Sequence, residues 1–210
     1  VYKRQLQACA SSESPMRDGS LDCTGLTRVG GTDLGALCVH DAVPSGLREA
    51  MLDGIEYVFQ PVGTSSSSSY VGREAGSRYP IGPQQKRELE ALSEQAFVDA
   101  LVALTLPPAA EPGAGVLGVR GQLLDVLLEV PEDPNSGAKY LFDTIGRATI
   151  VVELYDSATD QVLLRAFDHR ATERLPADAE SAETPSQMAA IAGLWQAVLS
   201  EAVRQLPRAN

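Results

Sequence analysis

Residues 145–170 are the segment that most constrains the fold. Between Gly146 and Leu154 every second residue is apolar, whereas the intervening residues are mixed in character. A period of two is that of an extended strand with one buried face. Turn-forming side chains follow at 156–160, and the same period resumes from Val162. The segment therefore predicts an antiparallel hairpin whose apolar face has to be covered by another layer.

Two amphipathic segments are suited to provide that cover. In residues 84–105 apolar side chains recur every three or four positions, and Pro107 follows as a stop signal. The second segment starts at Thr184 and Pro185, a typical helix cap followed by a first-turn proline. Its apolar stripe includes Trp195, which we expect to contribute more buried area than any other single residue.

Further strands are expected on both sides of the first helix. Residues 52–62 place Ile55, Tyr57 and Phe59 on one face, and residues 113–130 are rich in strand-forming side chains. A strand, a helix and a strand in this order pair in parallel through a right-handed crossover. The sequence thus predicts an α+β fold of two layers. It would have a mixed, largely antiparallel sheet of about four to six strands, with both helices on one face.

Shorter or more polar segments complete the chain. Residues 25–29 and 34–39 are short apolar runs, which fit either an edge hairpin or a strapped loop. Residues 63–83 are rich in Ser, Gly and Pro, which is typical of a long surface loop. We interpret residues 25–208 as a single globular domain.

The N-terminal residues have a different interpretation. Residues 1–5 match the translation of a transposon-end sequencing adapter, and we exclude them from the fold. Residues 6–24 are interpreted as the remnant of a lipobox, where a signal peptide would end, followed by a flexible tether. Leu-Gln-Ala-Cys at 6–9 resembles the bacterial lipobox, in which the cysteine thiol accepts diacylglycerol. The alternative is an ordinary cysteine in an N-terminal tail.

Lipidation of Cys9 would determine where the protein resides. Because Ala10 rather than Asp follows the cysteine, lipoprotein sorting favours the outer membrane, with the domain facing the periplasm. The sequence contains no apolar run long enough to span a bilayer. The net charge of -11 argues against binding to nucleic acid or to anionic lipid through surface charge. Any membrane link is therefore expected to run through the lipid at Cys9.

The remaining cysteines leave two alternatives open. With Cys9 assigned to lipid, Cys23 and Cys38 form an even pair in an exporting compartment, where they can form a disulfide. Two buried thiols are the other interpretation. The three cysteines have no Cys-x-x-Cys spacing and only His40 and His169 beside them, which is a poor metal-binding set. We expect neither a metal nor another cofactor.

No cluster of residues predicts catalysis. His169 stands between Asp168 and Arg170, and His40 precedes Asp41, but acid–base chemistry needs a partner group nearby in space. The sequence has no Gly-x-Ser-x-Gly nucleophile elbow, and its glycines do not follow a strand and open a helix as a phosphate loop would. We therefore expect no enzyme, and no catalytic or cofactor-binding residue.

The sequence has Val-Glu-Leu-Tyr-Asp-Ser-Ala-Thr at 152–159 and Val-Leu-Leu-Arg-Ala at 162–166. Together with three other segments, this hairpin resembles a family of bacterial lipoproteins known as domain of unknown function 3313. The hairpin motif is the most specific part. It consists of an acidic residue and Leu, then Asp-Ser-x-Thr, and then Val-Leu-x-Arg-Ala in the returning strand. Cys23 and Cys38 depart from the family pattern. Because the family has no assigned activity, the resemblance implies a fold and an envelope address but no catalytic residue. The segments that carry it are 25–29, 51–56, 112–117, 152–159 and 162–166.

The sequence predicts a bacterial cell-envelope lipoprotein that acts as a non-catalytic binding or accessory module in the periplasm. One alternative is a subunit of an envelope transport or lipid-trafficking complex, which would bind a protein partner through a sheet edge or the serine-rich loop. The other is an enzyme that uses His169 or His40.

Overall fold

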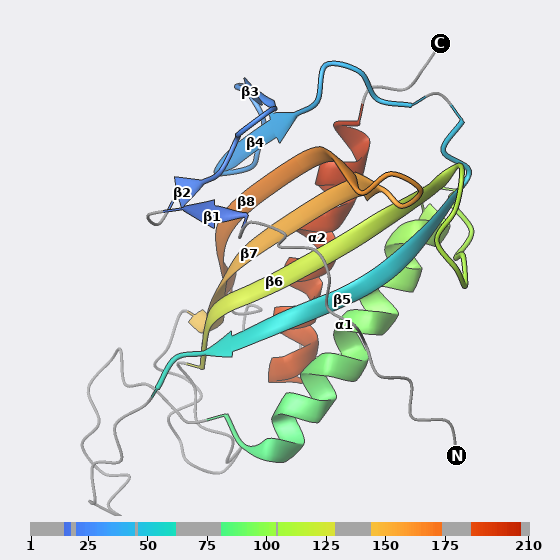
Figure 1. Ribbon diagram of the computed structural model, residues 1–210. Coiled ribbons are helices and arrows are strands. Elements are labelled where there is room, and N and C mark those ends of the chain that lie inside the picture. The colour runs from blue at the N-terminus through green and yellow to red at the C-terminus, as the bar shows by residue number, and fades with distance from the viewer. Residues whose placement is uncertain are drawn as a thin grey trace, which may run out of the picture.

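The computed structural model describes residues 15–17, 20–44, 46–61, 81–103, 105–128, 144–173 and 186–206. Figure 1 shows a curved sheet with both helices on one face. In chain order the elements are β1 (Met16–Arg17), β2 (Ser20–Leu21), β3 (Thr27–Val29), β4 (Ala36–Val39), β5 (Glu49–Phe59), α1 (Pro83–Ala103), β6 (Val116–Leu128), β7 (Thr144–Asp156), β8 (Gln161–Glu173) and α2 (Gln187–Arg204).

The main sheet has six strands in the order β3-β4-β8-β7-β6-β5. Neighbouring strands are antiparallel except for β5 and β6, which run parallel and are connected by way of α1. This confirms the predicted mixed, largely antiparallel sheet with two helices on one face. The short strands β1 and β2 form a separate two-stranded sheet.

The predicted hairpin is confirmed as β7 and β8. The two strands pair from Asp156 and Gln161 at the turn to Thr144 and Glu173 at the far end. In the turn, the Asp156 carboxylate accepts the backbone N–H of Ala158 at 2.9 Å. Asp156 therefore caps backbone amides, as the turn-forming character of the segment predicts.

The second helix packs across the sheet through its predicted stripe. Trp195 is fully buried, and a Cβ added at Gly121 of β6 would lie 2.6 Å from its ring. The absence of a side chain at Gly121 is what lets the indole approach the strand. The expected cap at Thr184 and Pro185 lies outside the described residues. The helix begins one residue after Ser186, whose hydroxyl accepts the N–H of Ala189 at 3.1 Å.

The outer edge of the sheet at β5 is partly blocked. Ala50 donates its N–H to the Pro107 carbonyl at 3.0 Å and accepts the N–H of Ala109 at 2.8 Å, so the loop after α1 pairs with this end of the strand. Farther along, a register shift occurs at Asp53, and Gly54 has a φ of +145°. Pairing with a loop and bulging of the strand are both features that oppose addition of a strand from another chain.

The two short apolar runs near the N-terminus form the other edge. Strands β3 and β4 pair as an antiparallel edge hairpin, with Thr27 opposite Val39. Residues 62–80, which include most of the predicted serine-rich loop, lie outside the described residues. No helix in the part of the chain that the structure describes is long and apolar enough to cross a membrane.

Candidate functional site

Charged side chains cross the sheet on the face away from the helices. Strands β8, β7, β6 and β5 contribute one charge each, Asp22 adds another at the β8 end, and the signs alternate along the row. We refer to these residues as the ion-pair row: Asp22, Arg165 on β8, Glu153 on β7, Arg120 on β6 and Asp53 on β5.

Strand register creates this row. Arg120 lies directly opposite Glu153, and Glu153 directly opposite Arg165. Val152 and Leu154, the neighbours of Glu153 along the strand, are fully buried in the core. The period of two therefore sends the apolar residues toward the helices and the charges toward the other face. Opposite charges at directly paired positions are favourable cross-strand neighbours.

The centre of the row is buried and fully paired. Glu153 is 4% exposed and Arg165 is 7% exposed. One carboxylate oxygen of Glu153 accepts Arg120 Nη1 at 3.3 Å, and the other accepts Arg165 Nε at 2.8 Å. Because buried charges are tolerated only when they are paired, each of these contacts matters for folding. Both carboxylate oxygens of Glu153 are thus engaged in structural contacts.

The outer end of the row contains an aromatic ring. Asp53 Oδ2 accepts hydrogen bonds from Arg120 Nε at 2.7 Å and from the Tyr155 hydroxyl at 2.8 Å. The Arg120 guanidinium lies 4.0 Å from the centre of the Tyr155 ring, a cation–π contact. Burial raises the pKa of Tyr155, and its hydrogen bond to Asp53 raises it further. The phenol therefore stays protonated and acts as a donor.

The Tyr155 ring lies directly against Gly118, and a Cβ at that position would collide with it. We expect Gly118→Ala to lower the free energy of unfolding by about 1–3 kcal/mol, because the ring must move and its contacts with Asp53 and Arg120 weaken. Urea unfolding followed by circular dichroism measures the change. Gly30→Ala is the matched control, because nothing lies within 4 Å of its added Cβ. Equal midpoints for the two variants would contradict the proposed packing.

Two carboxylates of the row predict a pH dependence of stability. Hydrogen bonds from Thr24 and the nearby charge of Arg165 hold the pKa of Asp22 below its usual value. Burial raises the pKa of Asp53, but hydrogen bonds from Arg120 and Tyr155 outweigh this effect and leave it below its usual value.

Each carboxyl binds its proton more weakly in the folded than in the unfolded chain. Its contribution to stability is therefore complete above the unfolded pKa of about 3.9 and is lost as the pH falls through the folded value. We expect the double variant Asp22→Asn with Asp53→Asn to lose less stability on acidification than the wild type. The free energy of unfolding, measured by urea unfolding at a series of acidic pH values, should therefore change less with pH. Asp33→Asn removes an exposed carboxylate outside the row and serves as the control. An unchanged pH dependence in the double variant would count against this assignment.

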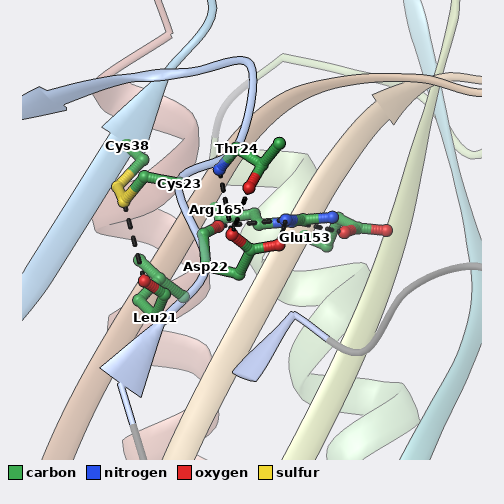
Figure 2. The surroundings of a disulfide bond; sticks show 7 residues. All are labelled: Leu21, Asp22, Cys23, Thr24, Cys38, Glu153 and Arg165. Carbon is green, nitrogen blue, oxygen red and sulfur yellow. Dashed lines mark hydrogen bonds and ion pairs between the residues drawn. A yellow bond between two sulfur atoms is a disulfide. The ribbon is translucent and has the colours of Figure 1, made fainter. Parts of the chain in front are cut away.

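Cys23 and Cys38 are joined in a disulfide, with their Cα atoms 5.7 Å apart. Cys38 lies on β4 directly opposite Arg165 of β8, so the cross-link lies at the end of the ion-pair row. Figure 2 shows Asp22, next to Cys23, directed toward the Arg165 guanidinium. The side chain and carbonyl of Asp22 accept Arg165 Nη1 at 3.1 and 3.0 Å. The sequence left a disulfide and two free thiols as alternatives for these cysteines, and the structure contains the disulfide.

The structure does not bring the two histidines together. The backbone N–H of His40 bonds to the carbonyl of Leu163, which lies six residues along β8 from His169, or about 20 Å in a strand. His40 Nε2 lies 2.9 Å from the Gln161 amide, and His169 Nδ1 lies 3.1 Å from the Thr149 hydroxyl. These ring contacts are with an amide and a hydroxyl, whereas an acid–base dyad pairs the ring with a carboxylate.

Cys9 lies outside the described residues, so its lipidation stays a prediction. Among the residues that the structure does describe, no cluster of His, Cys, Asp and Glu side chains is arranged to hold a metal ion. An open hollow of about 390 Å³ lies where β5 and β6 begin and β7 ends. Its lining residues are Pro44, Gly46, Leu47, Arg48, Ala114, Gly115 and Asp156.

The ion-pair row as a unit is not predicted by the sequence. A usable signal was present, because Arg120, Glu153 and Arg165 each stand between two apolar or glycine neighbours in a predicted strand. Asp53, Glu153 and Arg165 all lie in segments that the sequence predicts as strands. Asp22 had no such signal, because it lies in a polar stretch outside the recognised strands.

Comparison with known proteins gave similarities in structure alone. No family model matches the chain, and no curated protein sequence matches it. Two structures of the PelC dodecamer from Paraburkholderia phytofirmans are similar, with TM-scores of 0.40 and 0.38 and identities of 12% and 9%. They cover 79% and 88% of this chain, and 95% and 98% of the PelC chains. A PDZ domain protein from Parabacteroides distasonis is similar with a TM-score of 0.37 and 9% identity. The match covers 83% of this chain and 35% of the PDZ domain protein.

Proposed function

We propose that this protein is a bacterial cell-envelope lipoprotein, anchored in the outer membrane through Cys9, whose domain is a non-catalytic binding or accessory module in the periplasm. The disulfide between Cys23 and Cys38 is the observation that carries the proposal. Disulfides persist in exported proteins and are rare in the reducing cytosol. The lipobox-like sequence at 6–9 and the resemblance to a lipoprotein family support the same address.

The non-catalytic part of the proposal rests on how the charged groups are used. Glu153 has both carboxylate oxygens occupied, and the Tyr155 hydroxyl donates to Asp53. Groups bound in this way hold the sheet together and are poorly suited to exchanging protons with a substrate. The ring nitrogens of His40 and His169 lie beside amide and hydroxyl groups.

Expression of the gene with its native upstream sequence in a bacterium that processes lipoproteins tests the anchor. We expect the mature chain to begin at Cys9, to carry acyl chains by mass spectrometry and to fractionate with the outer membrane. Cys9→Ser should abolish both acylation and membrane association, whereas Cys23→Ser with Cys38→Ser should retain both. An unmodified Cys9 in the wild-type protein would disprove the proposed anchor.

The absence of catalysis is tested separately. We expect a chain that carries both His40→Ala and His169→Ala to complement a strain that lacks the gene. It should correct every defect of that strain as fully as the wild-type chain does. Loss of complementation by a double variant that is folded and present at wild-type levels would favour the enzyme alternative. Gln161→Ala, which removes a neighbour of His40 and leaves both imidazoles in place, is the matched control.

A further inference from the structure

Residues 20–24, which we call the strap, lie on the sheet face that carries the ion-pair row. The sequence places this segment in the predicted tether, yet the structure attaches it to the domain through Cys23 and Asp22. Cys23 is bonded to Cys38 of β4. Asp22 accepts two hydrogen bonds from Arg165 of β8. The two attachment points are adjacent in the sheet, because Cys38 and Arg165 are paired across neighbouring strands.

The strap contributes almost nothing to the hydrophobic core. Among the described residues, the buried core cluster begins at Leu34, and no strap residue belongs to it or packs against it. Burial of apolar surface is the main favourable term in docking one segment on another. Where that term is missing, docking relies on covalent and polar contacts, and in the strap these include the cross-link and the hydrogen bonds from Arg165 to Asp22. A segment attached in this way belongs to the least stable part of a structure, which opens without global unfolding.

We propose that the Cys23–Cys38 disulfide is a redox latch that keeps the strap docked on the ion-pair row and releases it on reduction, while the rest of the domain stays folded. In the closed state, Asp22 is the carboxylate partner at the end of the row. In the open state, Arg165 loses both hydrogen bonds to Asp22 and keeps only its contact with Glu153. A buried guanidinium on the sheet face then becomes accessible. The latch is independent of lipidation at Cys9.

The chemistry is thiol–disulfide exchange with a dithiol reductant. Cys38 is fully buried and Cys23 is partly exposed, so a thiolate of the reductant attacks the Cys23 sulfur. The bond between the two sulfurs breaks, and the Cys38 sulfur leaves as a thiolate that takes up a proton. The second thiol of the reductant then attacks the mixed disulfide and frees Cys23 as a thiol. Two electrons and two protons pass to the cysteines, and the dithiol becomes a disulfide.

Amide hydrogen exchange on the purified full chain, with and without dithiothreitol, tests the latch. Two amides report on the strap, since the N–H of Asp22 bonds to the Pro15 carbonyl and that of Thr24 to the Asp22 carboxylate. On reduction we expect exchange at both to rise about tenfold or more, and exchange in β7 to stay constant. The fluorescence of Trp195, the only tryptophan, should not change, because the helix layer stays packed.

Two variants separate the cross-link from the ion pair. Cys23→Ser with Cys38→Ser should show fast exchange at Asp22 and Thr24 without dithiothreitol and no further response to it. Asp22→Asn keeps the disulfide and should stay slow until reduced. Unchanged strap exchange in the reduced wild type would overturn the proposal. A concerted change in the strap, β7 and Trp195 would also overturn it, because the disulfide would then stabilise the whole domain.

Discussion

Replacing Trp195 with alanine is expected to lower the free energy of unfolding by about 3–5 kcal/mol. The side chain is fully buried between α2 and the sheet, where it lies over Gly121. Its indole nitrogen has no hydrogen-bond partner among the described residues. The expected loss therefore comes from packing and from the cavity left behind, with no hydrogen bond to lose. Urea unfolding followed by circular dichroism is the suitable measurement, because the substitution removes the fluorescent reporter.

A second substitution tests the contact itself. Gly121→Ala alone should be destabilising, because its Cβ would lie 2.6 Å from the indole ring. In a chain that already carries Trp195→Ala, the same methyl group would enter the vacated space at little cost. The two effects should therefore be strongly non-additive. Simple additivity, or a loss below about 1 kcal/mol for Trp195→Ala, would show that the helix does not pack on the sheet as described.

Replacing Arg165 with methionine is expected to cost about 3–5 kcal/mol, for a different reason. The substitution nearly keeps the side-chain volume but removes the only cation between Glu153 and Asp22 along the row. Glu153 is almost completely buried and retains a single, longer contact, to Arg120 at 3.3 Å. A buried carboxylate with too few donors is strongly unfavourable, whereas loss of an exposed ion pair costs little.

The control for this prediction is at the other end of the row. The Arg120 side chain is 32% exposed, whereas the Arg165 side chain is 9% exposed. Water can therefore replace more of the hydrogen bonds that are lost in Arg120→Met than of those lost in Arg165→Met. We expect Arg120→Met to be clearly milder in the same urea assay. Glu153→Gln should restore part of the stability lost in Arg165→Met, because it removes the uncompensated charge. Equal losses for the two arginine variants would mean that burial does not set the strength of the row.

Local patterns were sufficient to predict the layers of the fold. The period of two in β7 and the period of three to four in α2 each place apolar residues on one face, and both faces are buried. The residue at which α2 begins was harder to predict. Thr184 and Ser186 are both good caps by residue type, and only the structure shows that the Ser186 hydroxyl accepts the N–H of Ala189.

The ion-pair row was beyond such patterns because it depends on which strands become neighbours. Arg120 and Glu153 are 33 residues apart, and Asp22 and Arg165 are 143 apart. Their meeting requires the sheet order and the register together, and neither can be read from a local period. The disulfide is a different case, because the sequence offers Cys23 and Cys38 as a possible pair and the structure adds that their Cα atoms lie 5.7 Å apart.

The position of the cross-link has a mechanical consequence. Cys38 lies on β4, which is hydrogen-bonded to β3 on one side and to β8 on the other. Tension applied through the N-terminal end of the chain would therefore enter the sheet at a strand held on both sides, and would bypass the short edge strand β3. With the two sulfurs separated, the same pull would reach β3 first and could peel it away one hydrogen bond at a time.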